Sequence, residues 1–402
     1  CMEHRYELLK FEECGDSVRA VFMRNWYFDI PKTTLDALGT WSIHDNILTL
    51  PEDATSAFQR FIEDGLNGLT NAVSGIPTVY IHSGSGIPLI GNPAFGIVDR
   101  GTSLIEIKPL TSCNLVCRFC SVSEGGSAKQ ADFLVEADYL TATLTEVLAE
   151  KGLTQHQDAV EIHISCHGEP LLYGDLHHLI RGIRKLPAVQ QVSMNTNGVL
   201  LTEELVDSLA DAGLTRINLS LHTIDETEAK RLCGRPVDVD RLIAIARYIA
   251  HRPDIDLLLA SVWIPGVNDA GIRSVISLGK ELDVTLGIQN YLNYKGGRFV
   301  QKQVDWDTFR KNLEHLEAEF NVPLIMNMPK DFKIRKVKQI AKPFKKDQTV
   351  DARIVCRGHN PGEMVAAAME RCITIPNCTR RIGEKVRVKI TGDKHNIFYG
   401  KA

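Results

Sequence analysis

The stretch Cys113-Asn-Leu-Val-Cys117-Arg-Phe-Cys120 places three cysteines in one short loop. Three residues separate the first pair and two separate the second. A loop this tight can turn three thiolates onto one cuboidal iron–sulfur cluster, because the atoms of such a cluster lie only a few ångströms apart. Three protein ligands leave one iron of a four-iron cluster open. An open iron is a place for chemistry rather than for storage.

The alternative interpretation of this loop is a zinc site. Zinc sites usually need four protein ligands, commonly arranged as two pairs of Cys-x2-Cys type. No fourth Cys or His completes this loop. The pattern therefore favours a cluster.

At these residues the chain resembles the radical S-adenosylmethionine (SAM) family. The family signature is Cys-x3-Cys-x2-Cys with an aromatic residue, here Phe119, before the last cysteine. The resemblance implies that Cys113, Cys117 and Cys120 bind a 4Fe-4S cluster whose open iron binds the amino and carboxylate groups of SAM. It also implies reductive cleavage of SAM to a 5′-deoxyadenosyl radical that abstracts hydrogen. An electron donor such as ferredoxin or flavodoxin is then an expected partner.

Length and composition set the broad class. A chain of 402 residues predicts two or three domains, and 44% hydrophobic residues can bury a sizeable core. The net charge of −4 names no partner. No apolar run approaches the ~20 residues of a membrane span, and the start of the chain lacks the apolar segment of a signal peptide. Ten cysteines without a secretory segment predict a cytoplasmic protein with metal ligands and free thiols.

Strand-like and helix-like segments alternate from Leu104 onward. Strands are expected at 104–107, 159–165, 192–194, 217–221, 255–264 and 286–291, and helices at 133–151, 176–185, 203–212, 242–250, 272–282 and 309–320. Repeated β–α units of this length predict an α/β fold, a partial (β/α)6 TIM-type barrel with its crossover helices outside. Active sites in such barrels lie at the C-terminal ends of the strands. The cysteine loop falls there, directly after the first strand.

This core is expected to span residues 101–326. Residues 1–100 predict an N-terminal accessory domain that ends in the glycine-rich run Ile81–Gly91. Glycines permit tight turns, and a phosphate-binding loop is the alternative for this run.

A basic linker is expected at residues 327–348, with eight Lys or Arg against two Asp. One interpretation is a solvated linker. The other is a track for a polyanion, in which Lys and Arg pair phosphates while Phe332 and Phe344 stack on bases.

The last segment, residues 349–402, predicts a small β-barrel. Near its end apolar and basic residues alternate at period two, which is typical of a strand with one buried face. A Pro-Asn pair followed by Ile382-Gly-Glu-Lys-Val-Arg-Val-Lys-Ile resembles the TRAM domain, a small β-barrel found on RNA-modifying enzymes. Any small basic β-barrel is the alternative.

Further residues match the radical SAM pattern at the ends of the second and third strands. Gly168, Glu169 and Pro170 follow the second strand about 50 residues past the cysteines. The resemblance implies that this element holds the amino group of SAM. Asn195 and Asn197 follow the third strand, where the family contacts the ribose hydroxyls. The alternative for Asn197 is a simple Asn-Gly turn.

Three more SAM contacts are implied at the next two strand ends. Ser220 is expected to donate to the carboxylate of SAM, with His222 just beyond it. Ile264 is expected to pack on the adenine ring. A histidine at the end of a strand is also often structural, which is the alternative for His222.

Six of the seven remaining cysteines divide into three groups. Cys166, with His167 beside it, would face the radical site and touch substrate, or else form an ordinary buried pair of side chains. A second cluster is an option near the C-terminus, with three candidate ligands there, Cys356, Cys372 and Cys378. Cys14 and Cys233 are expected to be lone structural thiols.

Together these resemblances imply a radical SAM enzyme that modifies RNA, most naturally tRNA, similar to the predicted iron–sulfur oxidoreductases of archaea. One alternative is a radical SAM enzyme acting on a protein or metabolite, with the terminal barrel as a lid. Another is an RNA-binding protein whose core senses cluster or SAM. Methylthiotransferases carry three further cluster cysteines before the core. Only Cys1 and Cys14 lie there, which disfavours that chemistry.

Basic side chains outside the catalytic core are the expected RNA contacts. They are Lys333, Arg335, Lys336, Lys338, Arg380, Arg381, Arg387 and Lys389. All cluster and SAM residues lie upstream of Met326. We therefore expect removal of the chain after Met326 to abolish RNA binding and to leave SAM cleavage intact.

Overall fold

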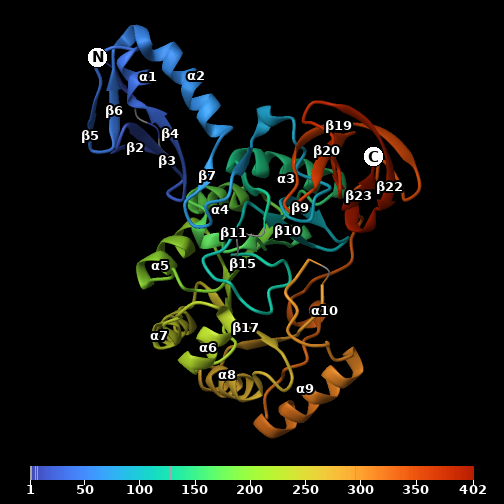
Figure 1. Cartoon of the computed structure of the whole chain (residues 1–402). Helices are drawn as coiled ribbons and strands as arrows, with labels where there is room; N and C mark the ends of the chain where they lie inside the picture. Colours follow the sequence, from blue (N-terminus) through green and yellow to red (C-terminus); the bar gives the residue numbers. More distant parts are fainter. Residues whose placement is uncertain (1, 5, 7, 126–128, 295) are drawn as a thin grey trace.

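The computed structural model describes residues 2–4, 6, 8–125, 129–294 and 296–402, so Cys1 lies outside the described residues. Figure 1 shows an N-terminal region and a C-terminal barrel on opposite sides of an α/β core. Within the described residues, no helix combines the length and the apolar character that crossing a bilayer requires.

The core is built on one seven-stranded sheet with the order β18-β17-β16-β15-β13-β10-β9. Six strands are parallel, and β9 adds to the β10 edge in the antiparallel sense. This is the partial (β/α)6 barrel that the sequence predicts. The strands are β9 (Gly96–Asp99), β10 (Leu104–Lys108), β13 (Val160–Ile164), β15 (Val189–Thr196), β16 (Arg216–Ser220), β17 (Asp256–Trp263) and β18 (Thr285–Asn290).

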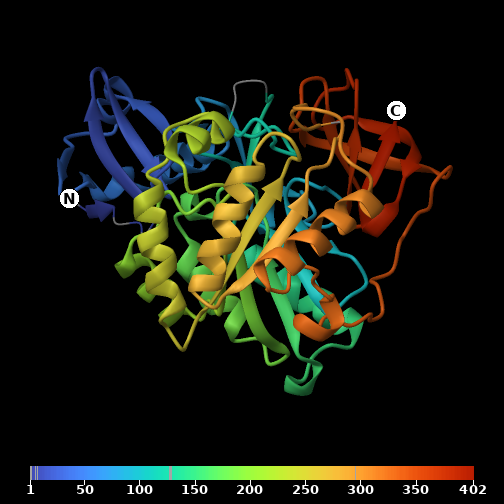
Figure 2. The same ribbon diagram turned by 90° about the horizontal axis from the view of Figure 1, so that it is seen from below.

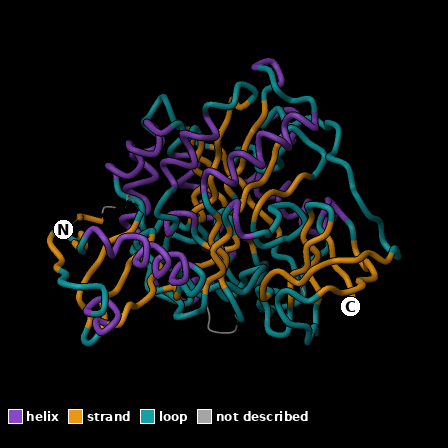
Figure 3. Tube along the Cα trace, turned by 90° about the horizontal axis from the view of Figure 1, so that it is seen from above, coloured by secondary structure: helices purple, strands orange, loops and turns teal. Residues whose placement is uncertain are grey.

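Helices cover the outer side of these strands, as Figures 2 and 3 show. They are α3 (Ala137–Lys151), α4 (Leu176–Arg184), α5 (Glu203–Ala212), α6 (Glu226–Cys233), α7 (Val239–Ala250), α8 (Asp269–Glu281) and α9 (Trp306–Phe320). In α4 the residues Leu176, Leu179, Ile180 and Ile183 are buried. Their spacing of three and four residues forms the apolar stripe that packs on the sheet.

Two expectations about these helices are corrected. The helix expected from Phe133 begins at Ala137, because Asp132–Val135 (β12) pairs in parallel with Thr78–Ile81 (β8). Pairing with a strand from the N-terminal region is a tertiary effect that local periodicity does not reveal. Helix α6 was not expected, and its C-terminal end proves to lie at the candidate site.

The N-terminal region contains two antiparallel sheets. One holds β2 (Leu9–Cys14), β3 (Ser17–Phe22), β4 (Trp26–Pro31) and β7 (Thr70–Asn71), and the other holds β1 (Met2–His4), β5 (Ser42–His44) and β6 (Ile47–Leu50). The short helix α1 (Lys32–Asp36) and the longer α2 (Thr55–Leu66) complete it.

The C-terminal barrel is closed, with the strand order β19-β20-β21-β23-β22. Its strands are β19 (Thr349–Arg357), β20 (Met364–Ala368), β21 (Arg371–Ile375), β22 (Lys385–Gly392) and β23 (Phe398–Lys401). In β22 burial alternates residue by residue, so Val386, Val388 and Ile390 face the barrel interior while Arg387 and Lys389 are exposed.

The segment before this barrel is not simply a solvated linker. It contains a short helix, α10 (Met328–Asp331), and then runs along the core, where Ile340 is buried. Phe344 is 1% exposed inside the barrel, with its ring centroid 4.4 Å from that of Phe398. The guanidinium carbon of Arg216 lies over the ring of Phe332, 5.0 Å from the centroid of that ring. Burial of Phe344 therefore overturns its expected role in stacking on bases.

The glycine-rich run before β9 holds the barrel against the core. Gly91 has a φ of +117°, and a Cβ there would lie 2.2 Å from the carbonyl oxygen of Cys372 on β21. The backbone of Cys372 donates to Ile90, and that of Phe398 donates to Gly91. Only glycine permits this approach. The structure thus gives the run a packing role in place of the phosphate-binding alternative.

Candidate cluster and cofactor site

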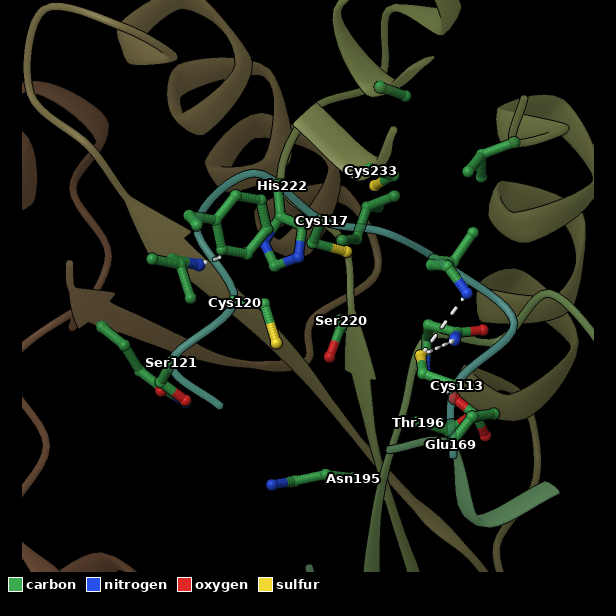
Figure 4. A pocket seen from close by; sticks show the side chains of 18 of the residues that line it. Cys113, Cys117, Cys120, Ser121, Glu169, Asn195, Thr196, Ser220, His222 and Cys233 are labelled. Atoms are coloured by element: carbon green, nitrogen blue, oxygen red, sulfur yellow. Dashed lines mark hydrogen bonds between the residues drawn. The ribbon is translucent and has the colours of Figure 1, made fainter. Parts of the chain in front are cut away.

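A cavity of about 390 Å³ opens at the C-terminal ends of the core strands. The three cysteines of the loop line it, and Figure 4 shows their side chains around the space in front of Ser220. Other polar residues of its wall come from the ends of successive strands, namely Glu169, Asn195, Thr196, Asn197, Ser220 and His222. The topology therefore gathers the cysteine loop and most of the expected SAM contacts at one site.

Gly168 is needed because two chain segments touch there. The strands β11 (Thr111–Ser112) and β14 (His167–Gly168) pair in parallel, directly before the cysteine loop and the Glu169 segment. Gly168 has a φ of +156°, and a Cβ would lie 1.9 Å from the carbonyl oxygen of Ser112. Any side chain at Gly168 would push the Glu169 segment away from the cysteine loop. Pro170 follows as the first residue of a short 3-10 helix.

Glu169 is the polar anchor of the cavity floor. Its side chain is 1% exposed and accepts hydrogen bonds from the Thr196 hydroxyl (2.7 Å), the Asn197 backbone N–H (2.8 Å) and the Leu171 backbone N–H (3.0 Å). Burial raises the pKa of Glu169 to about 7, and these three donors oppose that shift. Two of the three donors to Glu169, Thr196 and Asn197, lie at the end of β15. Glu169 therefore positions this strand end, in addition to its expected contact with SAM.

Asn195, in β15, and Asn197, directly after that strand, have different contacts. The side chain of Asn195 lines the cavity and accepts a hydrogen bond from Asn218 (2.9 Å). The side-chain amide of Asn197 donates to Asn114 (2.8 Å) and lies 3.9 Å from the sulfur of Cys113. Asn195 thus remains our proposal for the ribose contact. Asn197 fastens the cysteine loop to the strand end.

Ser220 and His222 lie at the end of β16. Ser220 is half-buried and lines the cavity. The Nδ1 of His222 accepts from the Val262 backbone N–H (3.1 Å), and its ring meets the ring of Phe119 edge-on at 4.7 Å. Burial lowers the pKa of His222 to about 4. The neutral imidazole is fixed by Val262 and Phe119 and lines the cavity. We therefore keep His222 as a proposed SAM contact, through its Nε2–H.

The expectation for Ile264 is not supported. Ile264 is fully buried and is not among the residues that line the cavity, whereas Val262 is. The Asn268 side chain bonds the N–H of Ile264 and the carbonyl of Val262, which turns the chain away after β17. We therefore propose Val262 as the adenine contact in place of Ile264.

Several residues that the sequence did not single out hold the cysteine loop. The backbone of Val116 donates to Cys233 at the end of α6, and the side chains of Cys117 and Cys233 hydrogen-bond. The guanidinium of Arg298 donates to the carbonyls of Cys117 and Glu124, at 2.7 Å each. The expectation of a lone thiol at Cys233 is corrected, since it also lines the cavity. These contacts are long-range, so sequence spacing carries no signal for them.

The three thiols of the loop border this cavity. Burial raises the pKa of Cys113 and of Cys120, and the hydrogen bond with Cys233 raises the pKa of Cys117. A thiol must lose its proton to bind a metal, so binding displaces these protons. No three His, Cys, Asp or Glu side chains of the described ranges converge as ligands of one metal ion. The sulfurs instead border the cavity at separate points, and Glu169 and Ser220 line the same cavity.

Cys166 and His167 lie in different environments. Cys166 is half-buried beside the core, and burial raises its pKa to about 12. His167 lines a second, smaller cavity of about 180 Å³ with Lys129, His359 and Tyr399. Burial lowers the pKa of His167. The second cavity shares Ser121 with the main one, so a contact between His167 and substrate stays a prediction.

The C-terminal cysteines have ordinary packing partners. Cys356 and Cys372 are buried, and the thiol of Cys372 donates to the carbonyl of Pro88 (3.1 Å). Cys378 is half-buried against the interior of the barrel. Nothing in these positions adds support to a second cluster.

The C-terminal barrel reaches the cysteine loop through a buried pair. His359, between β19 and β20, places Nε2 2.5 Å from a carboxylate oxygen of Glu124 and Nδ1 2.7 Å from the carbonyl of Ala131. The backbone N–H of Glu124 in turn donates to the sulfur of Cys120 (3.3 Å). His359 thus fixes the segment that holds one of the three cysteines.

We expect His359→Ala to loosen Cys120. The substitution leaves the buried carboxylate of Glu124 without its hydrogen-bond partner, and an unsatisfied buried group costs about 1–3 kcal/mol. Chemical denaturation should report that loss, and alkylation of Cys120, followed by mass spectrometry, should become faster. The control is Asn396→Ala, which removes a barrel-to-linker hydrogen bond to Ile340 away from the cysteine loop. Equal alkylation of Cys120 in both variants would contradict the role of His359.

This contact changes what we expect of the truncated chain. A chain ending at Met326 lacks His359 and also loses the hydrogen bond from Lys129 to Asn360. Glu124 would then be left without its barrel partner. We therefore expect the truncation to impair the site rather than to leave SAM cleavage intact.

Comparison with known proteins agrees with this geometry. Residues 107–279 match the model of the Radical SAM superfamily. The chain is 34% identical over 364 residues to the uncharacterized protein MJ0103 of Methanocaldococcus jannaschii, which covers 83% of this chain and 82% of that protein.

Other matches are less identical to this chain. The chain is 29% identical to GTP 3′,8-cyclase of Aquifex aeolicus over 52% of this chain and 61% of the cyclase. Among solved structures, Streptococcus suis SuiB bound to S-adenosylmethionine aligns with a TM-score of 0.44 and 19% identity, covering 79% of this chain and 70% of SuiB.

Proposed function

The chain belongs to the radical SAM superfamily, and from that premise we propose that it is an enzyme that modifies RNA, with tRNA as its substrate. Enzymes of this superfamily use a 4Fe-4S cluster and SAM. When bound, these two groups supply the one-electron and hydrogen-abstraction chemistry. This chain's residues must bind and orient SAM, exclude water and place a C–H bond of the substrate near it.

The site assignments in this proposal follow from the cavity. We propose Cys113, Cys117 and Cys120 as cluster ligands, and Glu169, Asn195, Ser220 and His222 as SAM contacts. The observation that carries the proposal is that one cavity brings the three sulfurs and these polar side chains together. The family requires a reductant, for which ferredoxin or flavodoxin is our proposal. The cytoplasmic location and the domain boundaries expected from the sequence stay predictions.

The RNA substrate is supported by the C-terminal barrel and its resemblance to TRAM. The barrel is closed and exposes Arg380, Arg381, Arg387 and Lys389. Acids stand near some of these cations, with Arg387 3.9 Å from Asp351 and Lys389 3.5 Å from Asp347. Both ion pairs are largely exposed, and the attraction within an exposed ion pair is weak. Phosphates can therefore still compete for the cations.

The linker contributes less to this surface than the sequence predicts. The guanidinium of Arg335 donates to the carbonyl of Asp158, and the ammonium of Lys338 donates to that of Glu150. These cations partly serve to fasten the linker to the core. Lys333 and Lys336 are exposed and remain proposed phosphate contacts.

A small nucleotide is the second candidate substrate. The observation that favours it is the 29% identity of the core to GTP 3′,8-cyclase over 213 residues. A cavity of about 390 Å³ is within the range of small-molecule sites. In this alternative the C-terminal barrel is a lid.

Salt titration separates the two candidates. Full-length protein should bind tRNA in gel-shift titrations with an affinity that falls steeply with salt, because cations on the protein release counterions from phosphates. The slope of log K against log[salt] should shrink by roughly one for each phosphate contact removed. The test variant is Arg387→Ala with Lys389→Ala, and the control is Lys311→Ala on α9. No affinity for tRNA at low salt would instead favour the nucleotide.

A further inference from the structure

Polar side chains run along one face of β16, leading away from the main cavity. Arg216, Asn218 and Ser220 share this face, because side chains two residues apart in a strand point the same way. Ser220 lines the cavity, whereas Arg216 and Asn218 do not. These two are buried, at 7% and 8% exposed. Buried polar groups are normally hydrogen-bonded, so their partners show what this face does.

The guanidinium of Arg216 is fixed inside the core. It donates to a carboxylate oxygen of Glu161 on β13, and the hydroxyl of Ser193 on β15 donates to the same oxygen (2.5 Å). The ring of Phe332 packs against it from the linker. A guanidinium stays charged in proteins and has no acceptor, so Arg216 can only donate hydrogen bonds.

This polarity passes from Arg216 to Asn195 through Asn218. A side-chain amide has an acceptor oxygen at one end and a donor nitrogen at the other. Because Arg216 can only donate, Asn218 turns its oxygen to the Nε of Arg216 (3.1 Å). The nitrogen of Asn218 therefore faces β15 and donates to the oxygen of Asn195 (2.9 Å). The NH2 group of Asn195 is left to face away from Asn218.

This NH2 group is the part of Asn195 that the cavity receives. Asn195 lines the cavity, and Figure 4 shows its nitrogen at the free end of the side chain. We infer that Arg216 and Asn218 are positioning residues that hold Asn195 as a hydrogen-bond donor to a ribose hydroxyl oxygen of SAM. This inference rests on the proposed function, in which Asn195 is the ribose contact, and adds two residues that lie outside the cavity wall.

A substitution that reverses the amide of Asn195 tests this inference. Asn218→Asp keeps the size of the side chain and its contact with Arg216, but an ionised carboxylate can only accept. Asn195 should then turn its NH2 to the new carboxylate and its oxygen to the cavity. Asn195→Ala should weaken SAM binding about fivefold, on the scale of one hydrogen bond, and Asn218→Asp should weaken it at least as much.

Anaerobic calorimetry with SAM on the reconstituted full chain measures these affinities. A pH of about 8 keeps a carboxylate beside a guanidinium ionised. The control repeats Asn218→Asp in an Asn195→Ala background, where it should have no further effect, since a double-mutant cycle isolates the coupling between two sites. Chemical denaturation checks that each variant is folded.

A second variant tests Arg216 itself. Arg216→Met combined with Glu161→Gln removes both charges together and leaves no unpaired buried charge. Without the guanidinium, either end of the Asn218 amide can face Asn195. With about half of the molecules in the productive orientation, the apparent affinity for SAM should fall about twofold.

Each result has a definite meaning. Parent-like affinity in Asn195→Ala or in Asn218→Asp would overturn the inference. An equal loss from Asn218→Asp with and without Asn195 would also overturn it, because the substitution would then act through packing or charge. Unchanged affinity in the Arg216→Met, Glu161→Gln variant would overturn the role of Arg216. These results leave the proposed function standing if the parent binds and cleaves SAM, whereas a parent that binds no SAM removes both.

Discussion

Replacing Cys113, Cys117 and Cys120 together with alanine should remove the cluster entirely. The parent protein, reconstituted anaerobically with iron and sulfide, should hold about four irons per chain. The triple variant should hold no site-specific iron, because no other cysteine can replace three ligands at this cavity. Cys233 lies there alone. Iron and sulfide analysis, together with visible absorption, measures the result.

The control for this experiment is a triple variant of cysteines elsewhere. Cys14 is exposed on the N-terminal region, and Cys356 and Cys378 lie in the C-terminal barrel. Replacing these three with alanine should leave about four irons per chain. Retention of four irons in the loop variant would contradict the assignment. A value of about eight irons in the parent, lowered to four in the control, would instead establish a second cluster.

Glu169→Ala should weaken SAM binding at least tenfold. The substitution removes an acceptor and leaves the buried Thr196 hydroxyl and the N–H of Asn197 without their partner. A hydrogen bond to a charged group such as the amino group of SAM contributes about 1.5–3 kcal/mol, and a tenfold change in affinity corresponds to about 1.4 kcal/mol. Asn197 also bonds Asn114 in the cysteine loop. A smaller loss of iron should therefore accompany the loss of affinity.

Ser220→Ala should separate the two effects. Ser220 lines the cavity at the end of β16, and we expect the variant to lose SAM affinity with its iron content unchanged. Anaerobic calorimetry with SAM measures the affinity. The matched control is Ser274→Ala on α8, whose hydroxyl donates to the carbonyl of Ala270 within its own helix. If Glu169→Ala and Ser220→Ala both bind SAM like the parent protein, the pocket lies elsewhere.

Local patterns predict the core of this fold well. The alternation of strands and helices from Leu104 onward is repeated by the observed elements, because each crossover helix has a strong apolar stripe. The helix of residues 203–212 has both end signals, with Thr202 capping the N-terminus and Gly213 at the C-terminus. The pairing of β12 with β8 was missed because it joins segments about 50 residues apart.

The candidate site shows the same division between local and long-range signals. Loop spacing marks the three cysteines, and position after a strand marks Glu169 and Ser220. By contrast, the contacts of Arg298 and His359 with the cysteine loop bridge residues more than 170 positions apart. A single sequence holds no pattern for such pairs. Position after a strand suggested Ile264, which does not line the cavity. The turn that Asn268 makes after β17 depends on side-chain hydrogen bonds that the sequence does not reveal.

The most direct test of the account is the reductive cleavage of SAM by the reconstituted full-length protein. With dithionite and without oxygen, the parent should produce 5′-deoxyadenosine and methionine, which chromatography coupled to mass spectrometry detects. The Cys113, Cys117 and Cys120 variant should produce neither. A parent protein that carries about four irons per chain, binds SAM and yet forms no 5′-deoxyadenosine would contradict the central claim.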